Sequence, residues 1–249
     1  AAGVKLRGGD VVRAKRAVVS NASVWDTVPM LPEGSVPPEW RLDALATQQC
    51  ESFVHLHLGI DAKDLPDDLE IHHIYVEDWE RGVTAEQNMC LVSIPSVLDP
   101  SLAPEGKHVI HAYTPGTEPY HHWEGMDRNS EEYKKLKEER SQVLWRAVEK
   151  AIPDVRERAE VVMVGTPLTQ QRFLRRSNGT YGGTGWVGGA GPSQAAPTPT
   201  TPLEGLLCVG DSMFPGPGVP AVAAGGMGAA HALVGVDKQC ETLDLVCPR

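Results

Sequence analysis

The sequence predicts a mixed α/β fold, and three stretches carry this prediction. A short apolar run at 206–209 is followed by a glycine- and proline-rich turn and then by small, helix-compatible residues as far as Leu233. This is the order of a buried parallel strand, a tight turn and a helix. From Ser52 the apolar residues recur at every second position, as in a half-buried strand. We expect further strands at about 71–77, 89–95 and 107–113 to complete an antiparallel sheet.

A longer helix is expected over 129–152. Its apolar residues fall on one stripe, and Pro153 stops it. Asn129 is the predicted N-cap, with Glu132 as its capping-box partner. This helix is predicted to cover one face of the sheet and leave the other face free to line a cavity.

Composition limits the classes of function. The 249 residues are 41% hydrophobic and 22% charged, with a formal net charge of -10, which suits one large or two modest domains. Lysine and arginine form no basic stripe, so no nucleic-acid partner is expected. No apolar run approaches the ~20 residues of a membrane span, so any contact with a bilayer would be peripheral. The five scattered cysteines favour reduced thiols over a zinc site.

The turn after the strand at 206–209 carries the candidate binding residues. Gly210, Asp211 and Ser212 end the strand, and the glycines of the turn let the backbone come close to a ligand. A helix beginning at Val219, with Pro220 in its first turn, places a partial positive charge there that favours anions. On composition alone, the small residues equally indicate close packing of a helix on a sheet.

The order of residues over 208–219 resembles the carboxy-terminal flavin-binding motif of the carotenoid isomerase branch of the phytoene desaturase-like FAD proteins. Other motifs agree with that family in the same order. They are Ala17–Ala22, Val92–Asp99, Trp123–Gly125, Gly165–Pro167 and Gly179–Gly182. The resemblance covers nearly the whole chain except about 183–200 and the residues after 236. It implies a two-domain, Rossmann-type flavoprotein with an antiparallel-sheet substrate domain.

The resemblance also implies which residues bind the flavin. Asp211 would contact the ribityl–pyrophosphate region, and the helix start would face the N1–C2=O edge of the ring, where reduction places negative charge. The candidate cofactor-binding residues are Asn21, Gly210, Asp211, Ser212, Gly216, Gly218, Val219 and Pro220. Asp211 has a structural alternative, in which it ends the strand through a turn. No catalytic residue is assigned.

The chain departs from the family pattern within this motif. Met213 stands where a cysteine is usual, Pro217 where a glutamine is usual, and Pro220 where the family has an apolar residue. Each proline removes a backbone donor, which weakens the predicted flavin contact.

The family needs an amino-terminal strand–GxGxxG–helix unit, which this chain lacks. A formal match at 183–188 has no apolar strand before it and a Pro/Thr-rich run after it, so it is interpreted as a loop. The chain opens on a hairpin signal without an initiator methionine or targeting segment. We therefore expect it to begin inside a domain, as a fragment or as half of a split flavoprotein. The predicted domains are 1–48 and 166–235 for flavin, 49–165 for substrate, and a tail at 236–249.

Nine histidines raise the question of a metal site. His55 and His57 share one face of a predicted strand and could ligate together, whereas adjacent pairs point oppositely. No third and fourth ligand occur at characteristic spacing. No metal is therefore predicted, and hydrogen-bonded or solvated histidines are the default interpretation.

The expected function is an FAD-dependent carotenoid cis–trans isomerisation, of the prolycopene to all-trans-lycopene type, with reduced FAD and no net redox change. The expected partners are the carotenoid, the missing amino-terminal half in the same or another chain, and a peripheral membrane or pigment–protein complex. Localisation in a plastid, peripheral to the thylakoid or envelope membrane, follows from the resemblance alone. The alternatives are a desaturase or ketolase of the same family, a non-catalytic structural or assembly subunit, and an amine oxidase-like enzyme.

Overall fold

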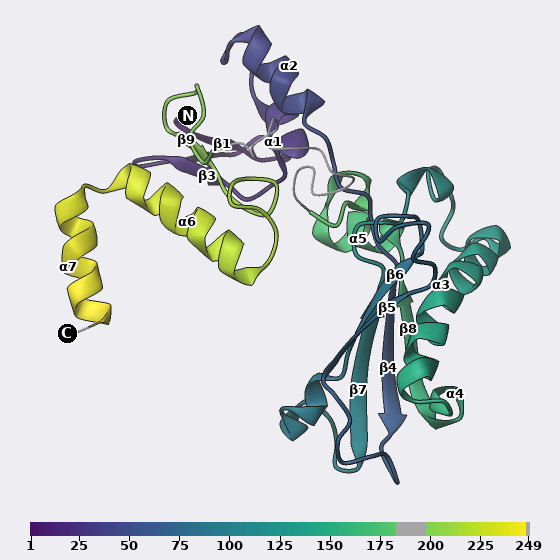
Figure 1. Ribbon diagram of the computed structural model, residues 1–249. Coiled ribbons are helices and arrows are strands. Elements are labelled where there is room, and N and C mark those ends of the chain that lie inside the picture. Colours follow the sequence, from purple (N-terminus) through teal and green to yellow (C-terminus); the bar gives the residue numbers. More distant parts are fainter. Residues whose placement is uncertain (183–197, 248–249) are drawn as a thin grey trace. The chain divides into compact units, whose positions relative to one another are not determined.

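The computed structural model describes residues 1–182 and 198–247, and the chain divides into two compact units (Figure 1). Unit 1 comprises Ala1–Gln49 and Gly182–Arg249, and unit 2 comprises Cys50–Tyr181. Two distant stretches of sequence therefore build unit 1, while unit 2 is continuous. The formal GxGxxG match at 183–188 lies outside the described residues.

Unit 2 is built on a five-stranded sheet. Its strands are β4 (His55–Asp61), β5 (His72–Val76), β6 (Met89–Ser93), β7 (Lys107–Tyr113) and β8 (Ala159–Gly165). The order is β5-β6-β7-β4-β8, and every neighbouring pair is antiparallel. The alternation read from the sequence is thus confirmed as an antiparallel sheet.

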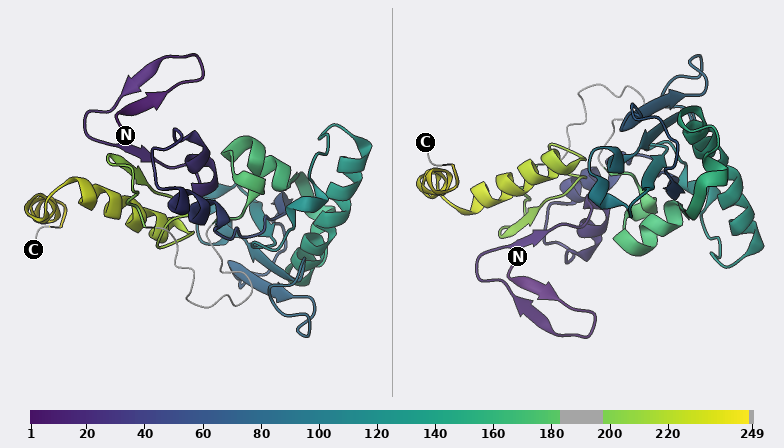
Figure 2. Two further views of the ribbon diagram at one scale, coloured as in Figure 1. Left: turned by 90° about the horizontal axis from the view of Figure 1, so that it is seen from above. Right: turned by 90° about the horizontal axis from the view of Figure 1, so that it is seen from below.

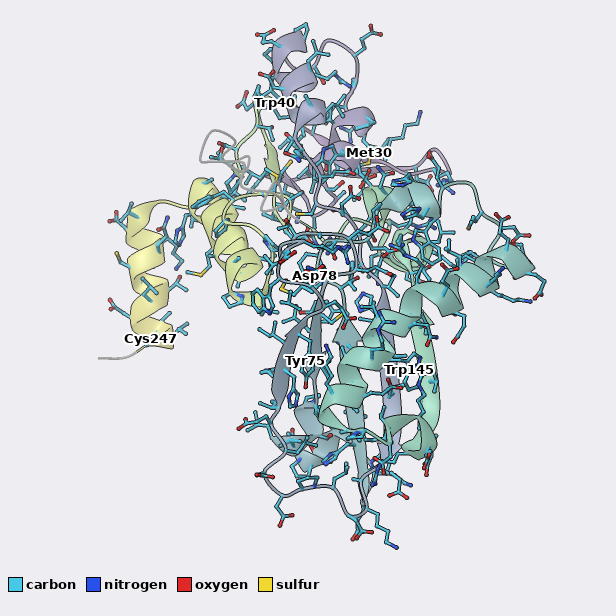
Figure 3. The ribbon with its side chains drawn as sticks, turned by 45° about the vertical axis from the view of Figure 1, so that its right-hand side comes forward. Met30, Trp40, Tyr75, Asp78, Trp145 and Cys247 are labelled. Atoms are coloured by element: carbon cyan, nitrogen blue, oxygen red, sulfur yellow. The ribbon has the colours of Figure 1, made fainter. Side chains whose placement is uncertain are left out.

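One face of this sheet is covered by α3 (Glu131–Ala151). Leu56 and Ile60 on β4 share a buried core with Leu144 and Val148 of the helix. Burying one such side chain stabilises the fold by about 1.5–3 kcal/mol. Figure 3 shows Trp145 on this helix. The opposite face of the sheet is free of α3, as the alternating pattern requires.

The start of α3 differs by one residue from the sequence prediction. Ser130 is the N-cap, and its hydroxyl accepts a hydrogen bond from the Tyr133 amide at 3.1 Å. Asn129 does not cap the helix, because its own amide donates to Asp127 Oδ1 at 2.9 Å and the turn continues to Ser130. An Asx turn therefore precedes the helix and moves its start.

Six shorter helical segments lie between or after the strands of unit 2. They are η1 (Pro95–Val97), η2 (Pro100–Leu102), η3 (Tyr120–His122), α4 (Val155–Arg158), α5 (Pro167–Leu174) and η4 (Ser177–Gly179). Thr166 caps α5, and Pro167 occupies its first turn.

The second division between the units falls at 181/182, whereas the sequence placed it at 165/166. Two contacts explain the difference. The Thr166 hydroxyl lies 2.8 Å from the Tyr133 hydroxyl of α3. Farther along, the Thr180 hydroxyl donates to the Cys50 carbonyl at 2.7 Å. The segment holding α5 and η4 is therefore bound to the sheet domain.

A buried carboxylate connects α3 to the rest of unit 2. Glu118 is fully buried, and it accepts hydrogen bonds from the Trp123 indole at 2.8 Å and from Arg140 Nε and Nη2 at 2.9 and 2.7 Å. Arg140 also forms an ion pair with Glu86 at 2.5 Å. Because buried charges need partners, the bidentate ion pair between Arg140 and Glu118 fixes α3 against the loop that holds Glu118.

Among the residues that the structure describes, unit 1 contains two small sheets. The hairpin β1 (Gly3–Lys5) and β2 (Val11–Arg13) confirms the turn signal at Gly8–Gly9 and is seen as an extended pair of strands in Figure 2. Strand β3 (Val18–Ser20) pairs in parallel with β9 (Leu206–Cys208). The predicted strand before the glycine-rich turn is therefore confirmed, with a partner from the start of the chain.

Four helices accompany these strands in the described part of unit 1. They are α1 (Val24–Met30), α2 (Pro38–Ala46), α6 (Val219–Leu233) and α7 (Val236–Val246). Val24, Val28, Ala44, Cys208 and Met213 form a small core. The predicted helix from Val219 to Leu233 is confirmed, and the predicted tail contains α7. Among the described residues, no helix has the length and apolar character needed to cross a membrane.

The thiols are expected to divide into two reactivity classes. Cys50, Cys90 and Cys208 are buried, whereas Cys240 and Cys247 on and after α7 are exposed. Burial raises the pKa of Cys90 to about 12 and that of Cys208 to about 11, so little reactive thiolate forms near neutral pH. Titration with a disulfide reagent should modify two thiols quickly in the native chain and all five after unfolding. Rapid native modification of Cys90 would contradict this packing.

Candidate functional site

The parallel pair β3–β9 brings together two predicted binding residues from opposite ends of the sequence. Ser20 is in register with Cys208, and the Val209 amide donates to the Ser20 carbonyl at 2.8 Å. Asn21 and Gly210 follow directly. A Cβ atom at Gly210, where φ is +112°, would lie only 2.8 Å from Asn21 Oδ1. Glycine is therefore required here for a close approach between the Asn21 side chain and the turn.

The next two candidates lie deeper in the same turn. Asp211 is half-buried. Ser212 is only 2% exposed, and its hydroxyl accepts a hydrogen bond from the Val24 amide at 3.2 Å. Because Val24 is the first residue of α1, Ser212 satisfies a helix-start N–H that has no intrahelical acceptor. The structure thus gives the Ser212 side chain a role in joining the turn to α1.

The turn at 213–218, called the glycine loop below, leads to the start of helix α6. Gly216 and Gly218 have φ values of +122° and +100°, and a Cβ on either would meet nothing within 4 Å. Gly218 is the N-cap of α6, and no side chain caps this helix. Val219 is 81% exposed, and Pro220 is the second helical residue. The first turn therefore presents backbone N–H groups, except the one that Pro220 lacks, beside the exposed backbone of Gly218.

These features fit one end of a flavin nucleotide. An uncapped helix start attracts negative charge, and the bare backbone of the glycine loop leaves room for a flat or anionic group to approach. Asn21 and Asp211 add polar side chains at the ends of the two parallel strands, where ligands of α/β folds bind.

The described part of unit 1 holds two cavities near this turn. One of about 610 Å³ is lined chiefly by α1 and α2, with Cys208 and Met213 at its wall. The other, of about 720 Å³, is lined by the first residues of the chain, β3 and the segment after α1. None of the eight predicted cofactor-binding residues lines either cavity. The candidate residues thus lie outside both cavities, and Ser212 and Gly216 among them are buried.

The open face of the sheet in unit 2 has a different chemistry. Three exposed apolar side chains, Ile74, Val161 and Met163, lie on it, 64%, 50% and 60% exposed. Between them runs a group of rings from β4, β7 and neighbouring segments. The group consists of Phe53, His55, His57, His111, Tyr113 and Tyr181. This face offers apolar and aromatic contacts with few charges.

Three histidines meet within this group. His57 is in register with His111, and their rings stack with centroids 4.5 Å apart. His55 Nδ1 lies 2.7 Å from His111 Nε2, which is a hydrogen bond between the two rings. The sequence showed that His55 and His57 share a face. It did not show His111, because the pairing of β4 with β7 cannot be read from spacing.

Burial keeps the His55 and His111 rings uncharged at neutral pH. It lowers the pKa of His55 to about 3, and repulsion from His111 and His57 adds to the effect. Burial, together with His57, lowers the pKa of His111 to about 4, and burial lowers the pKa of His57 as well. Each ring therefore has one nitrogen lone pair available as an acceptor or ligand.

Comparison with known proteins relates the chain to one group of enzymes. No family model matches the sequence. Prolycopene isomerase 1, chloroplastic, from an Oncidium hybrid cultivar is 39% identical over 98% of this chain. The chain is homologous to the prolycopene isomerases. The chloroplastic prolycopene isomerase of Arabidopsis thaliana is 37% identical over the same share of the chain. The chain spans 41% of the length of these two isomerases.

More distant proteins share the same region. Pyridine nucleotide-disulfide oxidoreductase domain-containing protein 2 from Rattus norvegicus is 28% identical over 92% of this chain and 43% of its own length. Among solved structures, an oxidoreductase from Methanosarcina mazei superposes with a TM-score of 0.55 at 18% identity, covering 91% of this chain and 44% of that protein. The PF1083 protein from Pyrococcus furiosus gives a TM-score of 0.52. These structures show that the chain shares the fold of the part that it matches, which is 44% of each of those proteins.

Proposed function

We propose that this chain forms the carboxy-terminal part of an FAD-dependent carotenoid cis–trans isomerase, converting a poly-cis lycopene to the all-trans form. One observation carries the proposal: 39% identity to a prolycopene isomerase extends over 98% of the chain. Both the strand–glycine loop–helix unit and the open sheet face lie within that shared region.

In this proposal unit 1 holds the flavin. The start of α6 offers backbone N–H groups to the edge of the ring, and Asp211 accepts a hydrogen bond from a ribityl hydroxyl. Reduced FAD, when bound, supplies electron density to a conjugated polyene, so that a cis bond can rotate without net redox change. The protein's own contribution is to hold the ring and to keep water and oxygen away from it.

Unit 2 provides the surface for the polyene. A carotenoid is long, flat and almost wholly apolar, so it needs apolar and aromatic contacts and few hydrogen bonds. The sheet face bearing Ile74, Met163, Tyr113 and Phe53 supplies such contacts.

The remaining part of the flavin site is assigned to an amino-terminal half bearing the GxGxxG unit, in the same or another chain. The helix α6 supports this assignment, because Val219 and Met227 are 81% and 55% exposed on a helix made largely of small apolar residues. The chloroplastic relatives support a plastid location, and association with a membrane or pigment–protein complex would be peripheral.

Two prolines near the start of α6 favour a second candidate function. Pro217 and Pro220 each lack the amide that a flavin could use. This observation supports a non-catalytic structural or assembly subunit that retains the fold. A desaturase or ketolase of the same family differs only in taking hydride from the carotenoid, and product mass distinguishes it.

Flavin content tests the proposed site. Asp211→Ala is expected to lower the FAD bound per chain in the native protein that contains this chain, because a ribityl hydrogen bond is lost. Such a bond contributes about 1.5–3 kcal/mol when one partner is charged, or roughly 10–150-fold in affinity. Asp244→Ala, on the exposed face of α7, is the matched control and should leave flavin content unchanged. Equal occupancy in both variants would show that Asp211 does not bind FAD.

A further inference from the structure

We propose that His55, His57 and His111 form a binding site for one transition-metal ion of the zinc class, on the open face of the sheet in unit 2. One ring nitrogen from each residue lies within 4.8 Å of the others. Among the described residues this is the one group of three potential ligands that come so close. The inference does not depend on flavin binding, because every residue involved belongs to unit 2.

The backbone places all three side chains together. Residues two apart on a strand share a face, so His55 and His57 project from β4 in the same direction. His111 on β7 is directly opposite His57 in the register. Cross-strand neighbours have Cβ atoms about 4.5–5.5 Å apart, which suits the short reach of an imidazole. The sheet therefore fixes three ligand positions that do not depend on a loop.

Small ring movements would complete the site. Zinc–nitrogen bonds of about 2.0–2.1 Å in a tetrahedron separate the nitrogens by roughly 3.4 Å. His55 Nδ1 and His111 Nε2 are now 2.7 Å apart, so the ion would replace the hydrogen bond between them. His57 stacks on His111 and has to turn its ring to direct a nitrogen inward. His57 is exposed on the sheet, so this rotation meets little packing.

A fourth residue orients the ligands. Gln170 on α5 has its side-chain amide 2.9 Å from His55 Nε2. As placed, the Gln170 amide nitrogen donates to His55 Nε2. A flip of the amide would bring Gln170 Oε1 to this position, so that His55 Nε2–H donates to Gln170 and the Nδ1 lone pair faces His111. Such outer contacts fix the tautomer of a ligating histidine. Gln170 is thus a positioning residue.

The ligand chemistry selects the ion. Neutral imidazole binds Zn²⁺, Cu²⁺, Ni²⁺ and Fe²⁺, whereas Mg²⁺ and Ca²⁺ prefer oxygen. Three histidines leave a fourth coordination position open, as in zinc sites that also bind water.

Calorimetric titration of the tag-free chain with Zn²⁺ tests the site. We expect saturation at one equivalent, with at least ~100-fold weaker binding for His57→Ala and His111→Ala and roughly 10–100-fold weaker binding for Gln170→Ala. His121→Ala, an exposed histidine of η3, is the control and should bind as the unaltered chain does. Co²⁺ should give the absorption bands of a tetrahedral site, and they should vanish in His57→Ala.

Two results would overturn the proposal. One is the lack of a saturable site at one equivalent in the unaltered chain. The other is unchanged Zn²⁺ affinity in His57→Ala. This second result is informative even if His111→Ala fails to fold, because His57 is exposed and its replacement should leave the core intact. Circular dichroism of each variant establishes that the sheet is intact.

Discussion

Replacing Glu118 with alanine is expected to lower the free energy of unfolding by about 3–5 kcal/mol. Glu118 is fully buried and neutralises Arg140, whose guanidinium donates to it at 2.9 and 2.7 Å. Without the Glu118 carboxylate, the Arg140 guanidinium retains only its ion pair with Glu86, which is partly exposed, and the Trp123 indole N–H loses its acceptor. The large effect arises because the buried guanidinium and indole N–H are left without partners, and not from the intrinsic strength of the ion pair.

Chemical denaturation followed by circular dichroism measures this loss. The matched control is Glu131→Ala at the start of α3, where the carboxylate is 89% exposed and pairs with Lys134 at 2.6 Å. An exposed pair of this kind contributes about 0–1 kcal/mol. If the two variants were destabilised equally, the buried network would have no special role in holding α3 in place.

Trp123→Ala is expected to cost about 3–5 kcal/mol of unfolding free energy in the same assay. Trp123 is fully buried, and its ring packs edge-on against Tyr133 with centroids 5.7 Å apart. Truncation removes the largest of the fully buried side chains and leaves a cavity that the surrounding strands and helix fill only in part. Trp123→Phe should recover part of the loss, because it restores apolar volume without the indole N–H.

Trp79→Ala is the control for Trp123→Ala. Trp79 is 76% exposed, so its replacement should change the free energy of unfolding by no more than about 0.5 kcal/mol. Glu118 and Trp123 share a hydrogen bond, so the double variant should lose less stability than the sum of the two single losses. A strictly additive double variant would contradict the shared network.

Local patterns were enough to predict the main elements. The period of two in β4, the apolar stripe of α3 and the strand–glycine–helix order around Gly218 each depend on neighbours in sequence, and each appears in the structure. The start of α3 moved to Ser130 because Asp127 organised the preceding turn, a competition between two local hydrogen bonds that residue order alone did not decide.

Features that depend on pairing between distant segments could not be predicted. His111 joins His55 and His57 only through the register of β7 with β4. Asn21 meets Gly210 only because β3 and β9 lie in parallel. The boundary at 181/182 likewise depends on contacts of Thr166 and Thr180 with unit 2. In each case the sequence supplied the residue type, and the tertiary arrangement supplied its partner.

The central claim is tested most directly by incubating the native protein that contains this chain with poly-cis lycopene and reduced FAD in the absence of oxygen. The account predicts all-trans-lycopene of unchanged mass, with no formation in the presence of oxidised FAD alone. A product that has lost hydrogen or gained oxygen would indicate a desaturase or ketolase. No conversion by a flavin-loaded preparation would contradict the isomerase function and favour a structural subunit.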